Sequence, residues 1–293
     1  MFSSINMTQV VKRDGTLTDL NIDKIKKVIN LATKDLEVNK LELESSLTTA
    51  LVDGVTTRTI QDNLINNAVN FTSLEYPDWR YVAGRLLMMS IWKDTVLSRG
   101  YRFNEHSFSN HVISMVDNGL YDSKLYNYSD KELDEVGSYI NYERDLDYDY
   151  AGASLLQKRY LIENELPQEM YMTISLLLAS VEKDNKLKYA KQFYDLISTR
   201  KISLATPILL NLRKPNGNLS SCFILGINDN IDSIFNNVKN LALISKNGGG
   251  AGAYLSKIRA TGSRIRNISN ASGGVLPWIK IINDTAIAVN QLG

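Results

Sequence analysis

Cysteine and histidine are almost absent from this sequence. Its 293 residues include one cysteine, Cys222, and two histidines, His106 and His111. A lone cysteine excludes an internal disulfide and any zinc or iron–sulfur site built from several cysteines. Two histidines make a histidine-built metal site unfavourable as well. We therefore predict that the chain holds no metal centre.

An excess of charge of one sign and long hydrophobic runs are lacking too. The 33 Lys+Arg and 32 Asp+Glu residues give a net charge of +1, whereas nucleic-acid-binding proteins concentrate basic residues on one face. No apolar run approaches the ~18–20 residues that cross a bilayer. The N-terminal stretch MFSSINMTQVVKRDG lacks the basic and apolar regions of a signal peptide. These absences predict a cytoplasmic globular protein without nucleic-acid or membrane partners.

The composition that is present suits a folded chain, with 44 % hydrophobic and 22 % charged residues. The length suggests about two domains, and the residue patterns divide the chain into three regions. We expect residues 1–100 to form a separate domain, residues 101–200 a helical region, and residues 201–293 the start of an α/β barrel or parallel sheet. The predicted fold class is α/β with a mainly helical N-terminal half.

The first region predicts a hairpin followed by helices. Residues 10–20 contain two apolar-rich runs around Asp14-Gly15, a strong turn pair. Asn21 is a good N-cap, and apolar residues recur behind it at helical spacing. Further helices are expected from near Thr57 and after Pro77.

The last region alternates short apolar runs with helical patterns. The runs KISLATPILL (201–210) and NLSSCFILGI (218–227) predict buried strands, because turn formers separate them. Residues 229–245 predict a helix, and a glycine-rich loop then leads into a further strand. Pro277 stands where a final helix favours a proline in its first turn.

Cations gather around the predicted hairpin. Lys12 and Arg13 precede its turn, Lys24 lies near the start of the next helix, and Thr18 and Asn21 lie between them. Cations beside a helix N-terminus suit a triphosphate, because they neutralise charge while free backbone N–H groups donate hydrogen bonds. The alternative, which composition alone favours, is a solvated basic hairpin.

Three glycines at 248–250, with Gly252, would let the backbone approach a bulky anion. They match neither a P-loop nor a complete G-x-G-x-x-G motif. A tight turn or close strand packing explains them equally well.

Cys222 follows Ser220-Ser221 in a strand-like run, and Thr206-Pro207 closes the preceding run. A lone cysteine in an apolar strand is most often an inert core residue. The neighbouring hydroxyls favour a pocket for phosphate and substrate instead, because a buried structural strand would hold apolar groups.

Asp229 stands just before the predicted helix and is either its N-cap or a ligand-binding residue. Arg259 and Arg266 flank the sequence ATGS. They are surface charges, or they bind the phosphates of a nucleotide whose ribose Asp229 holds, because a guanidinium matches phosphate oxygens and a carboxylate matches sugar hydroxyls.

Taken in order, these motifs resemble the N-terminal part of a class I ribonucleotide reductase large (alpha) subunit of the kind common in bacteria and their phages. Four segments carry the resemblance: VVKRDGTLTDLNIDKI, YERDLDYDYAGASLLQKRYL, STRKISLATPILLNLRKPNGNLSSCFI and IRATGSRIR. The resemblance implies an ATP-cone over 1–100, a helical segment over 101–200, and the first strands of an incomplete ten-stranded α/β barrel over 201–293.

The resemblance also implies roles for individual residues. Cys222 matches a catalytic cysteine, and Thr206, Ser221, Gly249 and Gly250 match positions at the substrate. The positions that match the specificity site, where a nucleoside triphosphate selects the base to be reduced, are Asp229, Asn230, Ile231, Arg259 and Arg266. Those that match the ATP-cone, which reads ATP against dATP, are Lys12, Arg13, Thr18, Asn21, Lys24 and Thr57.

The implied reaction reduces a ribonucleoside diphosphate to its 2′-deoxy form by thiyl-radical chemistry, and a thiol pair ends as a disulfide. Implied cofactors are ATP, dATP and other nucleoside triphosphate effectors with Mg²⁺, whereas the radical cofactor resides on a separate small subunit. Implied partners are that radical-generating small subunit, a thioredoxin- or glutaredoxin-type reductant, a second large subunit in a dimer, and the C-terminal half of the large subunit. Because Cys222 is the only cysteine, we predict that this chain alone is catalytically silent.

Three positions depart from the family pattern. Leu292 stands where a second glycine of a specificity loop is expected, Asp94 where lysine is frequent, and Gln61 where histidine is frequent. The last two changes concern the activity switch of the ATP-cone.

Three explanations follow for a chain that resembles only the front of a larger subunit. It is one piece of a split or interrupted large subunit, in the host cytoplasm if a phage encodes it, and its unpaired strand edges and apolar last helix then make it sticky. It is an ATP- or dATP-binding regulatory fragment without catalysis. It is the remnant of an interrupted gene.

Overall fold

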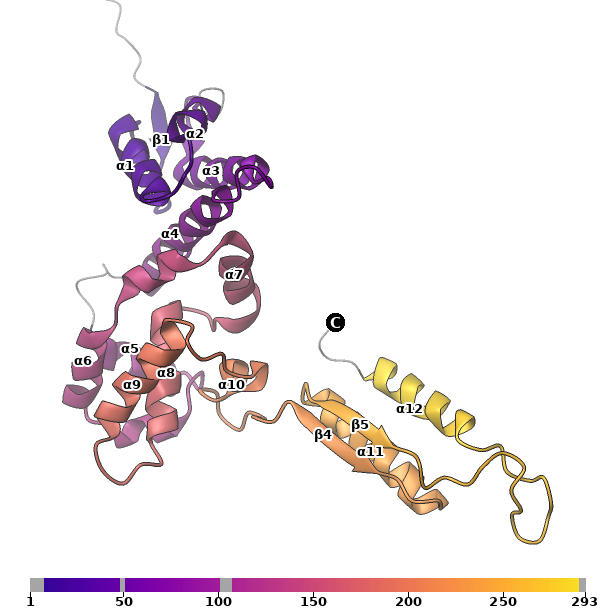
Figure 1. Cartoon of the computed structure of the whole chain (residues 1–293). Helices are drawn as coiled ribbons and strands as arrows, with labels where there is room; N and C mark the ends of the chain where they lie inside the picture. Colours follow the sequence, from indigo (N-terminus) through magenta and orange to yellow (C-terminus); the bar gives the residue numbers. More distant parts are fainter. Residues whose placement is uncertain (1–7, 48–50, 101–106, 290–293) are drawn as a thin grey trace, which may run out of the picture. The chain divides into compact units, whose positions relative to one another are not determined.

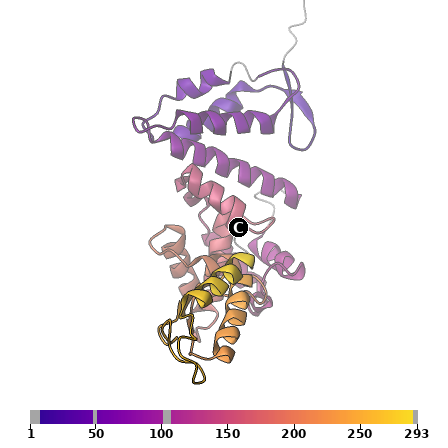
Figure 2. The same ribbon diagram turned by 90° about the vertical axis from the view of Figure 1, so that its right-hand side faces the viewer.

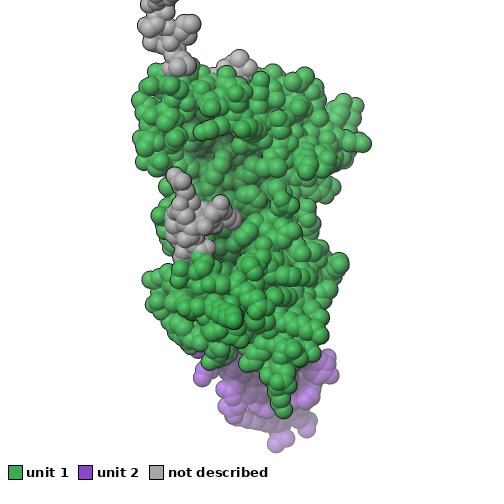
Figure 3. All heavy atoms as spheres, turned by 90° about the vertical axis from the view of Figure 1, so that its left-hand side faces the viewer, with its two compact units in different colours: residues 1–202 green, residues 203–293 purple. Residues whose placement is uncertain are grey.

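The computed structural model describes residues 8–47, 51–100 and 107–289. The chain separates into two compact units, Met1–Ile202 and Ser203–Gly293, shown in green and purple in Figure 3. His106 and Leu292, singled out in the sequence, lie outside the described residues. Within the described part of the chain, no helix is long and apolar enough to cross a membrane.

Unit 1 begins with the predicted hairpin (Figure 1). Strand β1 (Gln9–Val11) pairs antiparallel with β2 (Leu17–Asp19) around a turn in which the Gly15 amide donates to the Lys12 carbonyl over 3.0 Å. Gly15 has φ +84°, the left-handed region that favours glycine. A third strand, β3 (Val55–Thr56), pairs parallel with β1. The sequence did not predict β3, because two residues are too few to show an alternating pattern.

Four helices complete the N-terminal part of unit 1: α1 (Ile22–Thr33), α2 (Lys40–Ser46), α3 (Thr57–Phe71) and α4 (Trp79–Arg99). The three predicted helices are confirmed, and the short α2 was missed. Helix α4 runs alongside α3 (Figures 1 and 2). The buried side chains Ile29, Leu64, Trp79 and Leu86 belong to the core between the hairpin and these helices.

The rest of unit 1 is helical. Its elements are α5 (Phe108–Asp117), η1 (Ser123–Asn127), α6 (Asp130–Tyr139), η2 (Tyr142–Asp147), α7 (Tyr150–Leu155), η3 (Leu156–Tyr160), α8 (Pro167–Ala179) and α9 (Lys186–Ser198). Helix α8 is almost entirely buried and packs against α9. The last turns of α4 reach a buried ion pair in this part, since Arg99 Nη1 donates to Glu169 Oε1 over 2.9 Å.

Unit 2 contains a β–α–β arrangement. Strand β4 (Cys222–Gly226) pairs parallel with β5 (Gly250–Tyr254), and α11 (Ile231–Lys246) connects them. Helix α12 (Leu276–Ala288), with Pro277 in its first turn, packs on α11. The expected parallel strands and final helix are confirmed.

Two strand predictions in unit 2 need correction. The run 201–210 is not a buried strand: it contains the short helix α10 (Thr206–Asn211), because Pro207 starts a helical turn that the apolar pattern alone did not reveal. Strand β4 forms where predicted, but only Leu225 in it is buried. In the described part of unit 2 the side chains of Ile224, Leu276 and Ile287 are strongly exposed.

Candidate functional site

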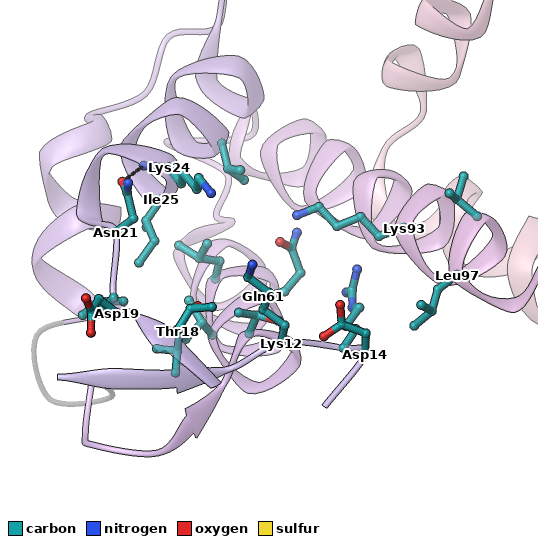
Figure 4. A pocket seen from close by; sticks show the side chains of 18 of the residues that line it. Lys12, Asp14, Thr18, Asp19, Asn21, Lys24, Ile25, Gln61, Lys93 and Leu97 are labelled. Carbon is teal, nitrogen blue, oxygen red and sulfur yellow. Dashed lines mark hydrogen bonds between the residues drawn. The ribbon is translucent and has the colours of Figure 1, made fainter. Parts of the chain in front are cut away.

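A cavity of about 750 Å³ lies in unit 1 between the hairpin, α1, α3 and α4. We call it the unit 1 cavity. It is lined by all six residues that the sequence assigned to the ATP-cone, namely Lys12, Arg13, Thr18, Asn21, Lys24 and Thr57. Figure 4 shows Lys12 and Thr18 on the hairpin, Lys24 on α1 and Gln61 on α3 around this space.

Two helices begin at the cavity. Asn21 caps α1, and its side-chain oxygen accepts from the Lys24 amide over 3.0 Å. Thr57 is the first residue of α3, which Thr56 caps by accepting from the Thr59 amide over 2.9 Å. Because helix N-termini carry partial positive charge and spare N–H donors, both ends favour a negatively charged ligand.

Arg13 is a nearly buried cation in the cavity wall, with 10 % of its side chain exposed. Its Nη2 donates to Ser90 Oγ over 2.8 Å, and its Nε lies 3.3 Å from Asp94 Oδ1. Among the described residues, Nε and Nη1 of Arg13 have no hydrogen-bond acceptor. Burial lowers the pKa of Arg13, and the Asp94 carboxylate opposes this effect. The guanidinium is thus held in place with donor capacity left over.

Lys93 is a cavity residue that sequence reasoning missed. Its side chain reaches from α4 toward Gln61 (Figure 4). Partial desolvation, followed by the charge of Arg13, lowers the pKa of the Lys93 ammonium. Its spacing could have identified it from the sequence, because Ser90, Lys93 and Leu97 lie three and four residues apart and so share one face of α4. A cation from α4 therefore does line the cavity, at the position next to Asp94.

Gln61 and Asp94, the two departures from the family pattern, have defined contacts. Gln61 is buried, lines the cavity and donates from Nε2 to the Leu86 carbonyl over 2.7 Å. Asp94 accepts from both Nη atoms of Arg58, over 2.6 and 3.1 Å. Gln61 therefore joins α3 to α4 through the Leu86 carbonyl, and Asp94 joins the same two helices through its ion pair with Arg58.

In unit 2, Cys222 and the residues predicted beside it meet at the start of the two strands. Cys222 faces Gly250 in the strand register, and the Gly250 amide donates to the Ser221 carbonyl over 2.8 Å. The Ser221 hydroxyl lies 3.6 Å from the Cys222 sulfur. Cys222 is exposed, so it is not buried in a core as the alternative interpretation expected. Thr206 is the first residue of helix α10, so it does not close a strand as predicted.

Gly249 is needed for packing. A Cβ added there would lie 2.7 Å from the Phe223 ring and 2.8 Å from Ile244 Cγ2. At Gly250 the nearest atom, the Ser221 carbonyl oxygen, is 3.5 Å away, an ordinary contact. Of the alternatives left open for these glycines, close packing explains Gly249.

Asp229 is not the N-cap of α11. Asn230 caps that helix by accepting from the Ser233 amide over 2.8 Å. Asp229 accepts instead from Arg259 Nε over 2.6 Å, so the structure brings these two predicted effector residues together. Ile231 is the exposed first residue of α11. Arg266, the remaining residue of this group, is exposed in a turn with φ +48°.

The described residues contain no group of three or more histidines, cysteines, aspartates or glutamates that could hold a metal ion.

Three protein families match successive parts of the chain. Residues 8–94 match the ATP cone domain, residues 146–217 the ribonucleotide reductase all-alpha domain, and residues 220–293 the ribonucleotide reductase barrel domain. The matches follow one another in the order that the sequence motifs implied.

Curated relatives match nearly the whole chain. The ribonucleoside-diphosphate reductase subunit alpha of Synechocystis sp. is 56 % identical over 286 residues, which cover 97 % of this chain and 37 % of the relative. Subunit alpha of enterobacteria phage T4 is 33 % identical over 99 % of this chain and 39 % of the relative. Subunit alpha of Escherichia coli reductase 1 is 31 % identical over 97 % and 38 %. The chain thus spans between a third and two fifths of the length of these relatives.

Proposed function

Because this chain belongs to the class I ribonucleotide reductase alpha-subunit family and corresponds to its N-terminal part, we propose that the unit 1 cavity binds ATP or dATP and thereby regulates ribonucleotide reduction. The ATP cone, the all-alpha domain and the first part of the barrel domain follow one another along the chain. We further propose that these correspond to residues 1–100, 101–200 and 201–293.

The observation that carries the proposal is the buried guanidinium of Arg13. It lines the cavity with donor capacity that no described acceptor uses. Lys12, Lys24 and Lys93 line the same space and add positive charge. Because buried donors that lack a hydrogen-bond acceptor are costly, an anion that accepts from Arg13 binds favourably, and a triphosphate supplies several such oxygens.

The cavity lining also includes aliphatic side chains. Val10, Leu20, Ile25 and Val28 belong to it, and such groups suit the planar base of a nucleotide. Cationic and aliphatic groups in one cavity match the phosphates and the base of a nucleoside triphosphate. The volume of about 750 Å³ lies in the range of small-molecule sites.

For the whole enzyme we propose the reaction that its relatives are named for. Cys222 supplies one thiol of a pair that becomes a disulfide while the ribose loses its 2′-hydroxyl as water. The chain has no other cysteine, so the second thiol comes from another polypeptide segment. The radical-generating small subunit, an external dithiol reductant and a second alpha subunit are the proposed partners.

Roles for the remaining unit 2 residues are part of the same proposal. Thr206, Ser221 and the backbone at Gly249 and Gly250 contact the substrate. The specificity effector binds at a site that comprises Asp229, Asn230, Ile231, Arg259 and Arg266. The ion pair between Asp229 and Arg259 supports this grouping, since a ribose hydroxyl can bind the carboxylate while phosphate binds the guanidinium.

Calorimetric titration of the full chain with ATP and with dATP, each with Mg²⁺, tests the proposed cavity function. We expect saturable binding that Arg13→Ala weakens at least tenfold, because a charge-assisted contact is worth about 1.5–3 kcal/mol. Arg80→Ala is the matched control: Arg80 lies on α4, is exposed and does not line the cavity. Equal affinities in wild type and Arg13→Ala would contradict the proposal.

A second experiment separates the enzyme from a regulatory fragment without catalysis. The chain is co-expressed with the remainder of a related alpha subunit, and reduction of a ribonucleoside diphosphate is assayed in the presence of the radical-generating small subunit and a dithiol reductant. Activity that Cys222→Ser abolishes supports the enzyme. Nucleotide binding without any activity supports the regulatory fragment.

A further inference from the structure

We propose that Asp94 is an internal counter-anion of the unit 1 cavity: it competes electrostatically with the phosphates for Arg13 and so lowers the affinity for highly charged nucleotides. The inference rests on the proposed function of the cavity as a nucleotide site. It concerns Asp94, which the sequence singled out only as a departure from the family pattern.

Asp94 lies between two guanidinium groups. Its Oδ1 lies 2.6 Å from Arg58 Nη2 and 3.3 Å from Arg13 Nε. The Arg58 contact is bidentate, because Nη1 also donates to Oδ2 over 3.1 Å. Arg58 on α3 therefore orients the carboxylate of Asp94 on α4, and this carboxylate also faces Arg13.

The three side chains differ in exposure and in their relation to the cavity. The side chain of Arg13 is 10 % exposed, that of Asp94 is 29 % exposed and that of Arg58 is 55 % exposed. Arg13 lines the cavity, whereas Asp94 and Arg58 do not line it. We therefore expect the phosphates of a bound nucleotide to act on Arg13 and to sense Asp94 through the field of its charge.

The charges around Arg13 are not balanced. Arg13, Lys93 and Arg58 carry three positive charges, and Asp94 and the more weakly acting Asp62 carry two negative charges, so the cluster keeps a net charge of +1 when both carboxylates are ionised. Replacing the Asp94 carboxylate with an amide raises the net charge to +2 while it preserves the shape. One unit charge within several ångströms of a phosphate, at the effective dielectric of a partly exposed site, changes affinity on the order of tenfold.

The sign of the effect distinguishes this role from a merely structural one. If Asp94 only positioned Arg13, its loss would loosen the guanidinium and weaken nucleotide binding. A counter-anion has the opposite effect: its removal strengthens binding, and the gain is larger for ATP than for ADP and larger for ADP than for AMP.

The test measures dissociation constants of the full chain for ATP, ADP, AMP and inorganic tripolyphosphate by calorimetry at low and high salt. For Asp94→Asn we expect about tenfold tighter binding of ATP and of tripolyphosphate at low salt, with a smaller gain for AMP. The gain shrinks at high salt. Weaker or unchanged ATP binding by a folded Asp94→Asn variant overturns the inference and leaves the proposed nucleotide site standing.

Asp62→Asn is the matched control. Asp62 is exposed on α3, and its charge acts on Arg13 less than that of Asp94. The substitution removes the same charge, so its gain in ATP affinity should be smaller than that of Asp94→Asn. An equal gain would show that the net charge of the chain matters and that the position of Asp94 does not.

Arg58→Gln completes a double-mutant cycle with Asp94→Asn. In the wild-type background the loss of Arg58 removes the bidentate partner of Asp94, so the carboxylate acts more strongly on Arg13 and ATP binding weakens. In the Asp94→Asn background the same loss should weaken ATP binding less, because Arg58 acts through Asp94. Equal losses in both backgrounds contradict this coupling. Absence of ATP and tripolyphosphate binding in wild type and in Asp94→Asn overturns the inference together with the proposed function.

Discussion

Asp145 is a buried carboxylate whose ionisation should set the pH dependence of unit 1 stability. It is fully buried and accepts from Trp92 Nε1 and from Gln168 Nε2, each over 2.8 Å. Burial raises its pKa from 3.8 to about 7, the two hydrogen bonds oppose that rise, and the nearby Glu169 carboxylate adds to it. Between about pH 3.8 and pH 7, Asp145 is therefore protonated in the folded chain and ionised in the unfolded chain.

The sign and size of the effect follow from that difference. The contribution of Asp145 to stability is complete below pH 3.8, falls as pH rises, and is lost above about pH 7. The separation between these two pKa values corresponds to about 4 kcal/mol of unfolding free energy. Between pH 5 and pH 8 the loss is about 3 kcal/mol.

Asp145→Asn tests this pH dependence. The asparagine amide cannot ionise. Its NH₂ group faces one of the two donors, Trp92 Nε1 or Gln168 Nε2, so one hydrogen bond is lost at a cost of about 1–3 kcal/mol at every pH. Relative to wild type, the variant should therefore gain about 3 kcal/mol between pH 5 and pH 8.

Urea unfolding followed by tryptophan fluorescence measures the difference. The chain has three tryptophans, and Trp278→Phe in both proteins leaves only Trp79 and Trp92, so the signal reports unit 1. A difference in unfolding free energy between wild type and Asp145→Asn that stays constant from pH 5 to pH 8 would refute the reasoning.

Two further predictions concern other charged groups. Glu169→Gln should lower the unfolding free energy by about 3–5 kcal/mol, because it removes the carboxylate that pairs with the buried Arg99 guanidinium. Lys191→Ala, which breaks the more exposed pair with Glu135, should cost less than about 1 kcal/mol in the same urea titration. Desolvation and the charge of Arg13 lower the pKa of Lys93, so Lys93 should lose its positive charge at a lower pH than an ordinary lysine, and ATP affinity should fall there. Lys93→Arg should remove this pH dependence when dissociation constants for ATP are compared across pH. A pH dependence that persists in Lys93→Arg would assign it to another group.

Elements with local signals could be predicted from the sequence. The hairpin at Asp14-Gly15, the capped start of α1 at Asn21 and the first-turn proline of α12 each depend on residues that lie side by side in the chain. Elements without such signals were missed or misassigned. Strand β3 has two residues, and the run around Pro207 fits a short helix as well as a strand.

The sequence alone determined the order of the segments and, through them, the family, because motif spacing is a property of the linear chain. It also identified six residues that line the unit 1 cavity. Only the tertiary structure decided that Lys93 joins them, that Cys222 is exposed and that Asp94 lies between Arg13 and Arg58. The cavity wall combines the hairpin, α1, α3 and α4, and side chains so far apart in sequence become neighbours only through the packing of these elements.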